Sequence, residues 1–168
     1  MSRLLDVCET RVSPSYRLLG LVDTSVDTCL LDAEPGKWLL SAPGMVYLQV
    51  PSEVVRASVR LESWTTRAPV SDASWSGSEE VEVELPEGEL ALFTIDSGQW
   101  PVSLVLPWAG VFRMRWHWIF NPERGPFTSP VADVTELLPK SAGFEESVMD
   151  TEIDQHILIQ IWRTAAVA

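Results

Sequence analysis

The sequence is poor in cysteine and has no long apolar run. It contains only two cysteines among 168 residues, Cys8 and Cys29, and no CxxC pair. Two cysteines are too few for a disulfide framework or a cysteine zinc site, and their apolar neighbours predict two buried free thiols. No apolar run approaches the roughly 20 residues that span a membrane, and Asp6 and Glu9 interrupt the N-terminal stretch before signal-peptide length. We therefore expect a cytoplasmic protein with no membrane contact.

Basic residues are also scarce. Twelve Lys and Arg stand against 24 Asp and Glu, which gives a formal net charge of −12. Phosphate backbones are bound mainly by Lys and Arg, so this balance disfavours direct binding to DNA or RNA. A basic protein partner fits the charge better, although a charge surplus also serves solubility.

Catalytic motifs are missing as well. No GxSxG, GxGxxG or GxxxxGK[ST] occurs, and the only histidines are His117 and His156. The alternating acids Asp150, Glu152 and Asp154 begin like a calcium loop but lack the turn glycine and the distal glutamate. We therefore predict no catalytic residues, no metal and no cofactor.

The pattern that the sequence does contain is a period of two between frequent turn signals. Turns such as "EPGK" (34–37), "PEGE" (86–89) and "DSGQ" (96–99) separate short runs of alternating apolar and polar residues. Such spacing is typical of a sandwich or barrel of antiparallel strands. We predict an all-β fold, a single antiparallel β-sandwich domain over residues 1–168, with a loop over 127–153 that has room for one short helix. The predicted strands are 15–22, 45–50, 55–62, 80–85, 89–95, 112–120 and 155–162.

The run Phe112–Phe120 separates aromatic from basic side chains completely. Its even positions carry Phe, Met, Trp, Trp and Phe, whereas Arg113, Arg115 and His117 occupy odd positions. Successive side chains of a strand point to opposite faces, so the pattern predicts one core face and one solvated face. A single-strand nucleic-acid platform would instead place aromatic and basic groups together. The two arginines should disfavour protonation of His117.

Acidic residues gather in one part of the chain. Between Ala68 and Phe112 there are eight acids and no base, and Glu80, Glu82 and Glu84 alternate with apolar residues. Alternate residues of a strand lie about 6.6–6.8 Å apart, close to two phosphate steps of about 3.4 Å each along one DNA strand. These three glutamates, the glutamate ladder, are our candidate contacts for a basic, nucleic-acid-binding partner. The plainer interpretation is a solvated sheet face whose glutamates pair with Arg113 and Arg115.

Several stretches together resemble a known family. "SPSYRLLGLVD" (13–23) and "LVLPWAGVFRMRWHW" (104–118) resemble strands of the bacterial competence protein J family, and "DASW" (72–75), "GELALFTID" (88–96) and "DQHILIQIW" (154–162) resemble a wider group of small bacterial proteins. Phe112 stands where that family usually has Tyr. The resemblance implies a β-sandwich and, for the competence protein J branch, inhibition of a partner nuclease. It implies no catalytic residues.

Three functions fit these observations. The first is a non-catalytic, acidic protein-binding module that inhibits a basic partner such as a nuclease, through Glu80, Glu82 and Glu84. The alternative is a structural or ligand-binding sandwich that acts through self-association, for instance as a homodimer, because five tryptophans (Trp38, Trp64, Trp75, Trp100 and Trp108) lie near predicted strand ends. An enzyme is the third, and it requires a pocket that collects polar groups around a histidine or a carboxylate.

Overall fold

The structure is a computed structural model of the 168-residue chain. It describes residues 1–13, 18–29, 31–32, 34, 37–50, 56–73, 75, 77–120, 153 and 155–164. The predicted helix within 127–153 and the acids Asp150, Glu152 and Asp154 lie outside these residues.

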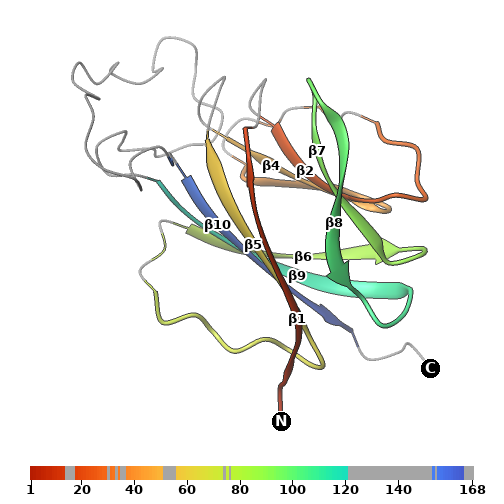
Figure 1. The fold of residues 1–168 in the computed structure, drawn as a ribbon, viewed down its shortest axis with the longest axis vertical. Coiled ribbons are helices and arrows are strands. Elements are labelled where there is room, and N and C mark those ends of the chain that lie inside the picture. The colour runs from red at the N-terminus through yellow and green to blue at the C-terminus, as the bar shows by residue number, and fades with distance from the viewer. Residues whose placement is uncertain are drawn as a thin grey trace.

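Within the described residues, ten strands form two five-stranded sheets that pack face to face (Figure 1). The first sheet has the order β1-β5-β10-β9-β6 and the second the order β3-β4-β2-β7-β8. Their bounds are Leu4–Val12 (β1), Leu18–Asp23 (β2), Leu39–Ala42 (β3), Met45–Gln49 (β4), Ala57–Trp64 (β5), Gly77–Leu85 (β6), Glu89–Thr94 (β7), Gly98–Val105 (β8), Gly110–Phe120 (β9) and Gln155–Arg163 (β10). No helix occurs among the described residues, so the predicted all-β sandwich is confirmed.

One strand pairing departs from the antiparallel prediction. β10 pairs antiparallel with β9 but parallel with β5, with Ile159 opposite Leu61. This places β10 in the middle of its sheet, and seven of its nine residues, from both faces, are buried. Strands of that kind read as nearly continuous apolar runs, and "ILIQIW" is such a run apart from Gln160.

Three strands of the structure were not predicted from the sequence. β1 carries alternating exposed and half-buried residues, β3 is only four residues long, and β8 contains Pro101. All three lie at sheet edges, where proline and polar side chains are tolerated because one side of the strand has no ladder partner. These three strands therefore alternate weakly, whereas β6, the fourth edge strand, alternates clearly because one of its faces packs on the core.

The inter-sheet core is built around tryptophan. Trp116 and Trp118 of β9 are buried completely, and Trp118 stacks on Trp38 with 4.7 Å between ring centroids. Gly77 of β6 permits this packing, since a Cβ at that position would lie 2.6 Å from the Trp118 ring. The aromatic face predicted for 112–120 thus lies in the core, as expected.

The second sheet has a smaller apolar cluster on its outer face. Val26 and Leu31, from the connection between β2 and β3, pack against this cluster, and the hydroxyl of its buried Tyr47 donates to the Cys29 carbonyl at 2.8 Å. Cys29 is bound here through its backbone. Its thiol is exposed and Cys8 is half-buried, so the prediction of two buried thiols is wrong, although both are free.

Asp23 ties the end of β2 to the turn between β6 and β7. Its buried carboxylate accepts hydrogen bonds from Ser25 N and Oγ at 3.0 and 2.5 Å, and from the backbone N–H groups of Glu87 and Gly88 at 3.0 and 2.8 Å. Burial acts to raise the pKa of Asp23, but these hydrogen bonds hold that pKa below its ordinary value. The aspartate that ends the "SPSYRLLGLVD" stretch is therefore a structural clamp.

The described residues form no helix that is long and apolar enough to cross a membrane.

Candidate functional site

The outer face of the first sheet carries a row of polar side chains that crosses four strands. The strand register places Glu80 opposite Arg115, Arg115 opposite Gln160, and Gln160 opposite Glu62. Hydrogen bonds join them in the same order: Arg115 Nη2 to Glu80 at 2.7 Å, Arg115 Nη1 to Gln160 at 3.4 Å, and Gln160 Nε2 to Glu62 at 3.2 Å. Arg60 continues the row by donating to Glu62 at 2.8 Å.

The chain between β5 and β6 covers part of this row. Arg115 Nη1 also donates to the carbonyls of Ala68 and Pro69, both at 3.3 Å. These bonds hold the covering segment on the sheet, and only 5% of the Arg115 side chain remains exposed. A buried guanidinium is costly unless its donors are paired, so Glu80 is the counterion that makes the burial of Arg115 tolerable.

Glu80 is engaged by arginines on three sides. Besides Arg115, Arg67 Nη2 lies 3.0 Å and Arg113 Nη1 3.9 Å from its carboxylate oxygens. Partial burial acts to raise the pKa of Glu80, but the bonds from Arg115 and Arg67 keep that pKa below its ordinary value. This carboxylate is therefore ionised at neutral pH, and its ion pairs are made with arginines of the same chain.

The other two members of the glutamate ladder are more open. Glu80, Glu82 and Glu84 all lie on the outer face of β6, as predicted. Glu82 is half exposed and contacts Arg113 Nη2 at 3.3 Å, whereas Glu84 is exposed and takes part in none of the ion pairs of the described chain. The cross-strand pairing with Arg113 and Arg115 expected from the plainer interpretation is present, and it neutralises the ladder unevenly.

His117 does not lie on a solvated face. It is 3% exposed, its ring stacks on Trp75 with 5.2 Å between centroids, and its Nε2 lies 3.3 Å from Gln160 Oε1. The sequence could not show that the segment before β6 folds back over this face. Burial, with a further contribution from the Arg115 charge, lowers the pKa of His117, so the predicted direction holds although the predicted environment was wrong.

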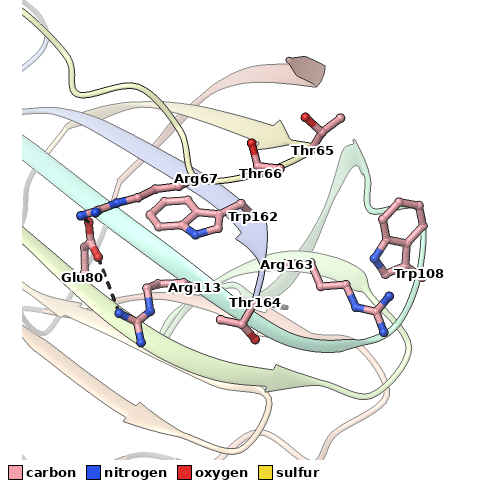
Figure 2. Close-up of a pocket in the computed structure, with 9 residues that line it drawn as sticks. All are labelled: Thr65, Thr66, Arg67, Glu80, Trp108, Arg113, Trp162, Arg163 and Thr164. Atoms are coloured by element: carbon pink, nitrogen blue, oxygen red, sulfur yellow. Dashed lines mark hydrogen bonds and ion pairs between the residues drawn. The ribbon is translucent and has the colours of Figure 1, made fainter. Parts of the chain in front are cut away.

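A cleft of about 570 Å³ opens at the end of the sheet beside this row (Figure 2). Three arginines (Arg67, Arg113 and Arg163), two tryptophans (Trp108 and Trp162), three threonines (Thr65, Thr66 and Thr164) and Glu80 line it. In Figure 2, Arg67 and Arg113 approach Glu80 on one side, while Arg163 lies near Trp108 on the other. Sequence reasoning missed this cleft because its basic residues come from three separate strands or loops.

Neither histidine belongs to a cavity described here. His117 is enclosed beneath Trp75, and His156 is exposed on β10. Neither lines the cleft of Figure 2, the hollow of about 250 Å³ beside Arg11 and Trp100, or the hollow of about 690 Å³ beside Glu87 and Gln99. The described residues also contain no cluster of His, Cys, Asp and Glu able to hold a metal ion.

The tryptophans predicted near strand ends have separate environments. Trp38 packs into the core against Trp118, and Trp64 Nε1 donates to Glu62 at 3.0 Å. Trp100 and Trp108 are 43% and 45% exposed, but they line two different cavities.

The fold and this face define the class of protein: a β-sandwich of two five-stranded sheets with a polar, ion-paired outer face. No family model matches the chain, and no curated protein matches it in sequence. Two solved structures share the fold over nearly their whole length. One is described as "Crystal structure of ComJ, inhibitor of the DNA degrading activity of NucA, from Bacillus subtilis" (12% identity, TM-score 0.62, covering 98% of this chain and 99% of that one). The other is described as "Crocagin biosynthetic gene J" (18% identity, TM-score 0.56, covering 94% and 96%).

The similarity confirms the sandwich implied by the resemblance to the competence protein J family. At these identities it establishes the fold alone, because one fold can carry unrelated functions.

Proposed function

We propose that the protein is a non-catalytic, inhibitor-type binding protein whose partner is a basic nuclease. The observation that carries the proposal is the fold shared with ComJ over 98% of this chain, because that protein is described as an inhibitor of a DNA-degrading activity. The net charge of −12 supports a basic partner, since complementary charge speeds association and selects among partners.

The glutamate ladder supplies the proposed contact surface, but its members have different roles. Glu82 and Glu84 project from β6 with much of their surface exposed. Glu80 is committed to Arg115, Arg67 and Arg113. We therefore assign the direct contacts with the partner to Glu82 and Glu84, and to Glu80 the task of holding the surrounding arginines in place.

Affinity capture tests this function. Immobilised protein is incubated with lysate of the organism that encodes it at low salt, eluted with a salt gradient, and each fraction is identified and assayed for DNA degradation. We expect a basic nuclease, released at moderate salt, whose activity the free protein suppresses. Capture of further copies of this chain alone would instead support self-association. Eluted nuclease activity that excess protein leaves unchanged would rule out inhibition.

A further inference from the structure

Arg163 is a cation without a carboxylate partner in the described part of the chain. It follows buried Trp162 at the end of β10, and its guanidinium carbon lies 5.7 Å from the ring centroid of Trp108. No ion pair to Arg163 occurs among the described residues, although the whole chain has twice as many acids as bases. This contrasts with Arg67 and Arg113 in the same cleft, which both bind Glu80.

The start of β9 lies beside this guanidinium. Gly110, which begins β9, has φ of +141°, and a Cβ there would lie 3.5 Å from Arg163 Nε and Nη2. The guanidinium thus lies beside the start of β9 on one side and over the Trp108 ring on another; a Cβ at Gly110 would make only an ordinary contact with it, and the positive φ is what favours glycine there. Contact with an aromatic ring engages the face of a guanidinium and leaves its in-plane N–H donors available for a planar oxyanion.

The charge of the cleft indicates the charge of the anion that it would bind. Three lining arginines stand against Glu80, which also lines the cleft, and Glu82, which binds Arg113. Arg67, Arg113 and the buried Arg115 all bind Glu80, and Arg113 also binds Glu82, so Arg163 is the lining arginine that has no ion pair among the described residues. One such charge suits a monoanion better than a dianion. A carboxylate fits this charge and the fork of Arg163 donors, whereas a phosphate dianion would meet Glu80 and Glu82 with excess negative charge.

The exposed ring of Trp108 indicates which chemical group the carboxylate should carry. Trp108 is 45% exposed and offers a flat apolar surface beside Arg163. The cleft volume of about 570 Å³ lies within the range of about 300–1,000 Å³ that is usual for small-ligand sites. We propose that this cleft binds a carboxylate attached to a flat apolar group, with Arg163 as the anion ligand and Trp108 as the apolar contact. Such a group is found on a small aromatic acid or at a peptide C-terminus that ends in an aromatic residue.

Two-dimensional ¹H–¹⁵N NMR of the full chain tests the site directly, because the indole N–H signals of Trp108 and Trp162 report from inside it. Four probes are titrated separately: 3-phenylpropanoate, its neutral amide, inorganic phosphate, and a pentapeptide ending in Phe as the free acid. We expect the two indole signals to shift with 3-phenylpropanoate, the peptide acid or both, and not with the amide or phosphate. A response to only one of the two acids identifies the source of the carboxylate.

Matched variants then assign the anion contact. Arg163→Gln should weaken binding about tenfold or more. Arg11→Gln removes the same charge near the other end of β10, beside the hollow lined by Trp100, and should leave the affinity unchanged. Three results would overturn the proposal. The indole signals could fail to shift at millimolar acid, or could shift equally with the amide or phosphate. Arg163→Gln could also bind the acid as tightly as wild type while its spectrum is otherwise native. None of these outcomes bears on nuclease inhibition, which is measured separately.

Discussion

Arg115 Nη2 donates to Glu80 Oε1 at 2.7 Å, and this contact joins a buried cation to the surface of β6. The Arg115 side chain is 5% exposed and that of Glu80 26%. The pair therefore contributes to the stability of the sheet as well as to its surface. Each glutamate of the ladder can be tested for whether it stabilises the fold or contacts a partner.

Glu80→Gln should destabilise the fold, because it removes the counterion of the buried Arg115. We expect a loss of about 2–3 kcal/mol in the free energy of unfolding, measured by urea titration. Glu84→Gln, four residues further along the same face of β6, should change it by less than about 0.5 kcal/mol. Equal effects of the two substitutions would mean that Glu80 is a surface residue like Glu84.

Asp23→Asn should cost about 2–4 kcal/mol, because an amide cannot accept the four hydrogen bonds that the carboxylate receives. The difference between wild type and variant should depend on pH with a defined sign. The pKa of Asp23 is lowered from 3.8 by folding, so the wild-type advantage is complete above about pH 4 and is lost as the pH falls through the lower pKa of the folded state. Urea titrations at pH 7 and at pH 3 measure it, and a difference that stays constant would contradict the clamp.

His117 should make the fold sensitive to mild acid. Folding lowers its pKa from 6.5, so the unfolded chain binds the proton first and stability falls as the pH drops below about 6.5. The loss should approach about 1.4 kcal/mol per pH unit until the folded pKa is reached. His117→Phe, which keeps the stack on Trp75, should abolish this slope in urea titrations between pH 7.5 and 5. His156→Gln, at an exposed position, should retain it.

Gly77→Ala should disturb the tryptophan core. Its Cβ would lie 2.6 Å from the Trp118 ring, and overpacking of this kind costs about 1–3 kcal/mol. Because Trp118 stacks on Trp38, near-ultraviolet circular dichroism should change with it. Gly98→Ala is the control, since its Cβ would meet nothing within 4 Å and only its φ of +68° is unfavourable. That variant should lose some stability and keep the tryptophan signal.

The sequence predicted well the strands that have one apolar and one polar face, and it predicted poorly what covers the outer face. Alternation in 112–120 and 80–85 reflects one buried face, so a period of two identified those strands and the exposed face that carries Glu80, Glu82 and Glu84. The burial of His117 could not be read from that period, because it depends on Trp75 folding back from a preceding loop. Gln160 is the one polar residue in "ILIQIW", and it could have suggested a buried polar row.

The cleft was beyond sequence reasoning for a similar cause. Arg67, Arg113 and Arg163 are about 50 positions apart in the chain, and only the pairing of β10 with both β5 and β9 brings them to one end of the sheet. Each arginine alone resembles an ordinary surface residue. That Arg163 has no carboxylate partner among the described residues becomes meaningful only when its neighbours in the cleft are known.

The most direct test of nuclease inhibition through the ladder compares two folded double variants in one assay. Glu82→Lys with Glu84→Lys reverses the outward ladder charges, and Asp27→Lys with Asp32→Lys makes the same change in net charge at exposed residues between β2 and β3. Each is titrated against DNA degradation by the captured nuclease at low salt. We expect the ladder variant to need about 10–100 times more protein for half inhibition than wild type, and the control variant to stay within about threefold of wild type. Equal loss of inhibition in both variants would mean that net charge alone causes the effect. Full inhibition by the ladder variant would contradict nuclease inhibition through the ladder.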